Sequence, residues 1–111
     1  MKFEDYFKIK GTYEFVDGVY NVIGNVTLIK KVEKLPFKFG KVTGIFNCSY
    51  NNLTSLEGCP RWIGYHFWCY LNKFTSLEDA PNYVGGGFVC DYKLKRTKEY
   101  RQYLIFKKLR S

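Results

Sequence analysis

A repeat of 21 residues constrains the fold of this chain more than any other feature of its sequence. Cys48, Cys69 and Cys90 are each 21 residues apart, and a phenylalanine stands two residues before each of them. The segment 46–60 aligns with 67–81 without a gap. A fixed short period is the signature of stacked repeats, in which each copy contacts only its neighbours. We therefore expect a solenoid, because one copy has too little apolar surface to bury its own face.

Within one copy, the apolar residues predict a short strand followed by a turn. Phe46 and Cys48 alternate with polar positions, so both side chains point to the same face of a strand. Asn51 follows, where its amide can pair with backbone groups that the coil would otherwise leave without partners. Leu53 and Leu56 complete the apolar set. The pattern predicts ladders of like side chains inside the solenoid.

The cysteines fit a core better than a metal site or a disulfide framework. The fourth cysteine is Cys59. No two of the four lie two to four residues apart, which is the spacing of a zinc site, and His66 is the only histidine. The first residues lack the apolar run of a secretion signal, so we expect a cytoplasmic protein with reduced, buried thiols. We also expect no metal, no cofactor and no membrane contact.

The segments outside the repeats predict a cap at each end of a single domain. Residues 1–23 read as a β-hairpin, with Asp17-Gly18 as its turn, that covers the open edge of the first coil. Residues 24–92 carry the repeats. Residues 93–111 form a basic tail, expected to be a helix from Thr97, with a strand at residues 103–106 as the alternative. The predicted fold is mainly β: a short leucine-rich-repeat-like solenoid with an N-terminal hairpin cap and a basic C-terminal helix.

The first repeat is the least regular. Residues 24–28 look like a shortened version of the later strands. Residues 36–40 echo residues 60–64, and this alignment predicts an insertion of three residues before Phe46.

Two segments carry a resemblance to a known group of proteins. Residues 46–52 and 53–60 resemble the repeats of small leucine-rich-repeat-like proteins of tailed bacteriophages, and the likeness extends over about residues 18–92. The resemblance implies a compact repeat fold and a viral accessory protein acting in the bacterial cytoplasm. It implies no particular target.

Side chains that alternate with the buried positions form a candidate partner-binding surface. If Phe46 and Cys48 point inward, their neighbours, Ser49 included, point outward, and the next strand presents three large rings. Trp and Tyr are enriched in interface hot spots. Either a partner or a second copy of the chain covers these rings, or the tail folds back over them. The candidate partner-binding residues are Asn47, His66, Trp68, Tyr70 and Val89.

Another pair of rings is repeated one period apart. Trp62 and Tyr83 stand at equivalent positions, and we expect them to pack in the convex layer, with a role in recognition as the alternative.

The net charge of +8 is concentrated in the tail. Residues 93–110 hold eight basic and one acidic side chain, which is +7, whereas residues 1–92 hold ten basic and nine acidic side chains, which is +1. Such a segment can bind phosphates, bind an acidic protein, or serve only as a solvated end. Tyrosines interleaved with the charges (Tyr92, Tyr100, Tyr103) suit nucleic acid. The candidate contacts are Lys93, Lys95, Arg96, Lys98, Arg101, Lys107, Lys108 and Arg110.

The sequence has no motif that predicts catalysis. Gly85-Gly86-Gly87 lacks the lysine of a phosphate-binding loop, and no nucleophile stands in a known catalytic context. We therefore expect a non-catalytic protein-binding module. Together with the resemblance, this predicts a phage factor that inhibits or redirects a bacterial host protein, such as a defence enzyme. The alternatives are nucleic-acid binding through the tail and a homo-oligomeric structural protein.

Overall fold

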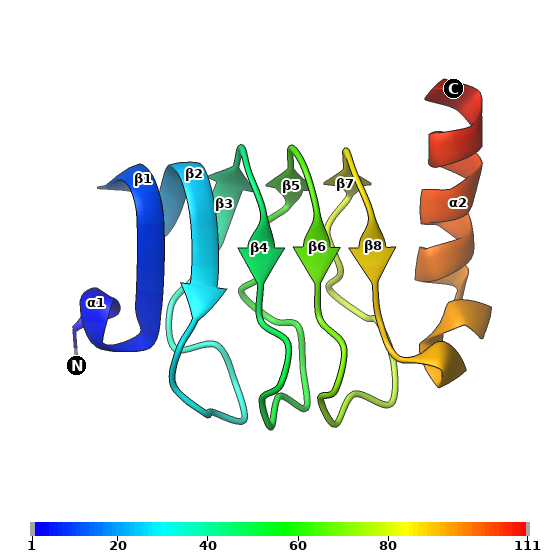
Figure 1. Ribbon diagram of the computed structural model, residues 1–111, viewed down its shortest axis with the longest axis horizontal. Coiled ribbons are helices and arrows are strands. Elements are labelled where there is room, and N and C mark those ends of the chain that lie inside the picture. The colour runs from blue at the N-terminus through cyan, green and yellow to red at the C-terminus, as the bar shows by residue number, and fades with distance from the viewer. Residues whose placement is uncertain (1, 111) are drawn as a thin grey trace.

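The computed structural model describes residues 2–110 as a β-solenoid of about three turns, with a long hairpin at its N-terminal end and a helix at its C-terminal end (Figure 1). Each coil contributes one strand to each of two parallel ladders. The first ladder stacks β3 (Phe39–Val42), β5 (Trp62–Ile63) and β7 (Tyr83–Val84). The second stacks β4 (Phe46–Asn47), β6 (Phe67–Trp68) and β8 (Phe88–Val89). The fold is the predicted short solenoid, with two strands in each repeat where the sequence pattern predicted one.

The strand register confirms the 21-residue period and corrects the alignment of the first repeat. In the second ladder, Phe46 lies opposite Phe67. In the first ladder, Val42 lies opposite Ile63, so both copies have the same spacing from this position to the phenylalanine. The insertion predicted before Phe46 was therefore wrong. Register follows the side chains that face the core, and Val42 and Ile63 are fully buried, whereas prolines mark only where the chain turns.

The N-terminal hairpin is longer than the sequence predicted. It consists of β1 (Phe7–Val16) and β2 (Val19–Leu28), which pair antiparallel. Asp17 and Gly18 both have positive φ (52° and 82°), which identifies the tight turn that Asp-Gly predicts. β2 continues five residues past the predicted boundary at residue 23 and forms part of the first coil.

A pair of glycines lets the hairpin serve both ladders. Gly11 lies opposite Gly24, both with φ near +136°. A Cβ on either one would collide with the backbone of the opposing strand. The strand pair bends here, so the first half of β2 pairs with β3 and the second half with β4. A single strand thus starts both ladders.

The core consists of rows of like side chains, one member from each coil. The Phe, Cys and Leu positions of the repeat are all buried. Each fully buried large side chain contributes about 1.5–3 kcal/mol to folding. At the N-terminal end, α1 (Phe3–Tyr6) closes the core by stacking the Phe3 ring on Tyr20 at a centroid distance of 3.9 Å. The main rows are Phe46, Phe67 and Phe88; Cys48, Cys69 and Cys90; Leu53 and Phe74; and Leu56 and Leu77.

The repeated asparagines pair with loop backbone, as predicted. Asn72 Oδ1 accepts a hydrogen bond from the Leu53 N–H at 2.9 Å, and Asn72 Nδ2 donates to the Cys48 carbonyl oxygen at 2.9 Å. One coil earlier, Asn51 Oδ1 accepts from the Val32 N–H at 3.2 Å. These side chains join consecutive coils where the strands have ended.

The tail folds into η1 (Tyr92–Arg96), a 3-10 helix, and α2 (Lys98–Arg110). Thr97 caps α2 as predicted, because its Oγ1 accepts a hydrogen bond from the Tyr100 N–H at 3.3 Å. The alternative of a strand in this segment was wrong. α2 lies across the end of the last coil (Figure 1). Residues 1 and 111, which the predicted hairpin and tail segments include, lie outside the described residues.

Candidate partner-binding surface

Four rings in and beside β6 form a surface here called the aromatic strip: Tyr65, His66, Trp68 and Tyr70. The centroids of the Tyr65 and His66 rings are 3.8 Å apart, and those of His66 and Trp68 are 5.8 Å apart with an interplanar angle of 14°. Tyr70 contacts the ring of Tyr50 at 5.3 Å. Most of the strip is preorganised, because Tyr65, His66 and Trp68 already pack on one another, and Tyr70 packs on Tyr50.

The C-terminal helix leaves this surface uncovered. The inward rings of α2, Tyr100 and Tyr103, pack edge-on against Phe88 at centroid distances of 5.5 and 5.3 Å. They therefore close the end of the last coil, whereas the aromatic strip lies on the side of the middle coil (Figure 1). Of the two alternatives, the one in which the tail folds back over the rings was wrong. Tyr103 and Arg110 pair with backbone groups at the edge of the last coil, and these hydrogen bonds hold the helix at this end.

His66 is partly a structural residue. Its Nδ1 accepts a hydrogen bond from the Gly87 N–H at 2.8 Å, which ties the second coil to the third. A ring nitrogen that accepts an N–H carries no proton, so the proton of the neutral ring is on Nε2. Nε2 is therefore the atom of His66 that a partner can engage.

Asn47 and Val89 flank the strip on the neighbouring strands. Asn47 lies opposite Trp68 on one side, and Val89, 41% exposed, lies opposite Trp68 on the other. Ser49 was expected on this face, but it is buried, and Asn47 Oδ1 accepts hydrogen bonds from its N–H and hydroxyl groups. The alternation fails at Ser49 because β4 ends at Asn47 and the chain turns inward. Asn47, Trp68 and Val89 thus lie side by side across the second ladder, with His66 directly before β6 and Tyr70 after it.

A second exposed row follows the strand ends, and its first two members were missed in the sequence. Tyr50, Leu71 and Tyr92 are 60%, 52% and 80% exposed. Each stands two residues after a cysteine of the ladder, so the repeat itself contained the signal. The row lies directly beside the strip, since Tyr50 contacts Tyr70.

The first ladder carries two stacked rings between two cations on its outer side. The Lys41 Nζ lies 4.4 Å from the Trp62 ring centroid, and Trp62 stacks on Tyr83 at 5.2 Å and 13°. The Arg110 guanidinium lies 4.9 Å from the centre of the Tyr83 ring. Trp62 and Tyr83 are half-buried by each other and by these cations, so their faces are already occupied.

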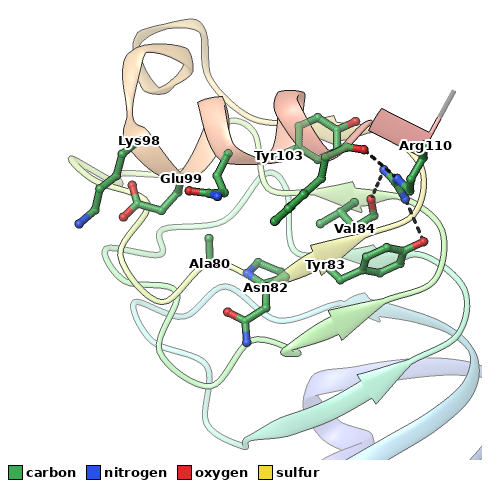
Figure 2. Close-up of a pocket in the computed structure, with 11 residues that line it drawn as sticks. Ala80, Asn82, Tyr83, Val84, Lys98, Glu99, Tyr103 and Arg110 are labelled. Carbon is green, nitrogen blue, oxygen red and sulfur yellow. Dashed lines mark hydrogen bonds between the residues drawn. The ribbon is translucent and has the colours of Figure 1, made fainter. Parts of the chain in front are cut away.

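A groove of about 550 Å³ runs between α2 and the last coil (Figure 2). At one end of it, Arg110 donates hydrogen bonds to the Tyr83 hydroxyl at 2.8 Å and to the Val84 carbonyl oxygen at 3.1 Å. Among residues 2–110, no three His, Cys, Asp or Glu side chains lie close enough together to hold a metal ion. The groove is a consequence of how α2 closes the coil.

The basic side chains of the tail are exposed, but the tyrosines among them are mostly not free for stacking. Tyr100 and Tyr103 face the last coil, which leaves only Tyr92 of the three exposed for contact with a base. Arg110 is occupied with backbone carbonyls. The predicted contacts lie on η1 (Lys93, Lys95, Arg96) and on α2 (Lys98, Arg101, Lys107, Lys108, Arg110).

The four cysteines are free and buried, as predicted for core residues. Burial raises the pKa of Cys59 to about 12 and the pKa of Cys90 to about 11, and it raises the pKa of the Cys48 and Cys69 thiols as well. A thiol that holds its proton is a poor nucleophile. These residues support the fold.

Comparison with known proteins yields no match: no family model, curated protein or solved structure is similar to this chain. No helix in the described part of the chain is long and apolar enough to cross a bilayer. Any function must therefore be argued from the chemistry of the surfaces described above.

Proposed function

We propose that this chain is a non-catalytic protein-binding module that contacts its partner through the aromatic strip. The observation that carries the proposal is the uncovered row of Tyr65, His66, Trp68 and Tyr70, which the C-terminal helix leaves open. Tyr and Trp side chains dominate interface energies because they bury a large area at a low entropic cost. Side chains that already pack on a neighbouring ring lose less conformational entropy when a partner binds than free side chains do.

The partner that we propose is a bacterial host protein, which the module inhibits or redirects in the cytoplasm. The likeness of the repeats to those of small phage proteins supports this choice. A defence enzyme of the host would be a partner of this kind.

Capture from a bacterial lysate with the wild type and Trp68→Ala tests the proposal. Trp62→Ala is the matched control, because Trp62 is also a half-buried tryptophan on the outside of a two-residue strand. The recovered protein is purified and its dissociation constant is measured with all three chains. We expect Trp68→Ala to weaken binding about tenfold or more, and Trp62→Ala to leave it within about threefold.

Two results would contradict the proposal. If both tryptophan variants recover every partner as well as the wild type does, the strip is not the binding surface. If light scattering shows a stable dimer that Trp68→Ala dissociates, a second copy of the chain occupies the strip instead.

Nucleic-acid binding through the tail is the competing function, favoured by the exposed cations of η1 and α2. It predicts an affinity that falls steeply with salt. The test is a gel shift with Lys93→Glu/Lys95→Glu in the full chain, because removing the tail would also remove the cap of the last coil. If the wild type and the charge-reversed variant shift the nucleic acid equally at low salt, η1 does not contact it.

A further inference from the structure

Two large side chains stand in a backbone conformation that disfavours them. Tyr50 and Leu71 have φ values of 58° and 57°, in the left-handed region, and both are more than half exposed. Asn, Asp or Gly adopts this conformation at a lower cost than a bulky residue. The chain holds Tyr and Leu here although they gain little burial, and such strain is typical of functional positions.

These two residues connect the aromatic strip to the basic segment that follows the last coil. Tyr50 packs against Tyr70 of the strip at 5.3 Å. The N–H of Leu71 donates to Asp91 Oδ1 at 2.8 Å, and Tyr92 comes next in the chain. The exposed row therefore runs from the strip to the start of η1.

The charge at that end is mainly positive, because the Asp91 carboxylate is engaged by the Leu71 N–H and three cations follow it in the chain. Lys93, Lys95 and Arg96 are exposed on η1, which holds no acidic residue, and the Lys95 Nζ lies 5.9 Å from the Tyr92 ring centroid. A partner that covers the row meets these cations in a poorly solvated position, where carboxylates are the complementary groups. A second copy of the chain would bring the same cations and be repelled.

We propose that the row formed by Tyr50, Leu71 and Tyr92 binds an acidic, extended segment of the partner protein. Apolar side chains of that segment lie on Tyr50 and Leu71, and its carboxylates face the cations of η1. The inference rests on the proposed function, since it extends the aromatic strip and names the chemistry of what binds there.

A display library of random peptides, selected against the full chain, is the probe. We expect the selected peptides to carry Asp or Glu next to aromatic or aliphatic residues. The strongest binder is then synthesised, and its affinity is measured by fluorescence anisotropy. Leu71→Asn is expected to weaken binding about tenfold. Lys93→Glu/Lys95→Glu is expected to weaken it and to reduce its dependence on salt.

Leu109→Asn is the matched control for the anchor. Leu109 is 76% exposed and lies on α2, so the same substitution is made at an exposed leucine away from the row. It should leave the affinity unchanged. Leu71→Asn should also raise Tm by about 4 °C, because it relieves the left-handed strain, so weaker binding cannot come from unfolding.

Several results would overturn the proposal. The proposal is wrong if the selected peptides carry no excess of acidic residues. It is also wrong if Leu71→Asn does not change their affinity. If Trp68→Ala abolishes peptide binding while Leu71→Asn and the charge reversal do not, the proposed function stands and this extension fails. If a random single-stranded oligonucleotide binds more tightly than any peptide, and loses affinity in the charge-reversed variant, the row is a nucleic-acid surface.

Discussion

The hydroxyl group of Tyr103 donates a hydrogen bond to the carbonyl oxygen of Gly86 over 2.7 Å, and it accepts one from the N–H of Phe88 over 3.2 Å. One coil earlier, the equivalent carbonyl of Tyr65 and the equivalent N–H of Phe67 pair with backbone of the next coil, at 2.7 and 2.8 Å. A single phenol therefore replaces two backbone groups of an absent fourth coil. This contact ends the solenoid and keeps α2 off the outward face.

Tyr103→Phe should lower the free energy of unfolding by about 1–3 kcal/mol, because it leaves two backbone groups of the last coil without partners while the ring still packs on Phe88. Urea unfolding measures the change. Tyr100→Phe is the control, since Tyr100 also packs on Phe88 by its ring. Equal losses in both variants would mean that the hydroxyl of Tyr103 does not cap the coil.

Asn72→Ala should cost about 2–4 kcal/mol of the free energy of unfolding, because the Leu53 N–H and the Cys48 carbonyl lose their partner between two coils. Thermal unfolding followed by circular dichroism measures it. Asn82→Ala, at an exposed position, should change stability by less than about 0.5 kcal/mol. Similar values for the two variants would contradict a structural role for the repeated asparagine.

Leu71→Asn should stabilise the fold by about 0.5–1 kcal/mol, because asparagine adopts the left-handed conformation at a lower cost than leucine. Chemical denaturation gives the value. Leu109→Asn, in ordinary helical backbone, should instead be neutral or mildly destabilising. A destabilised Leu71→Asn would show that the Leu71 side chain contributes packing that outweighs its strain.

Alkaline pH should weaken the fold through the buried thiols. Burial raises the pKa of Cys90 to about 11 from an ordinary value of 9.0, so the folded chain keeps a proton that the unfolded chain has lost. The stabilising contribution is complete below about pH 9, and it falls by up to ~1.4 kcal/mol per pH unit for each ionising thiol as the pH rises towards 11.

Urea midpoints between about pH 8 and about pH 10.5, compared with those of Cys90→Ala, test this dependence. Tyrosine and lysine titration is common to both proteins and cancels in the comparison. The slope of stability against pH should be shallower in the variant. Parallel slopes would show that the thiol of Cys90 does not couple to folding.

The repeat alone determined that the chain stacks coils, because its period brings each buried position above its equivalent. Phe46, Cys48 and Asn51 have the roles that their spacing predicted. The Asp17-Gly18 turn and the Thr97 cap were predictable for a similar reason, since both act within a few residues of the chain. Local stereochemistry and a fixed period need no knowledge of distant contacts.

Only the tertiary structure decided where the tail lies and which surface remains open. No local pattern shows that Tyr103 and Arg110 pair with the last coil, because the backbone groups that they contact lie 15 to 26 residues away and are common to every sequence. For the same reason, the sequence pattern did not predict the second strand of each coil or the bend at Gly24. The last coil has an open edge only once the solenoid is assembled, and the helix that covers this edge leaves the half-buried Trp68 on the side of the middle coil.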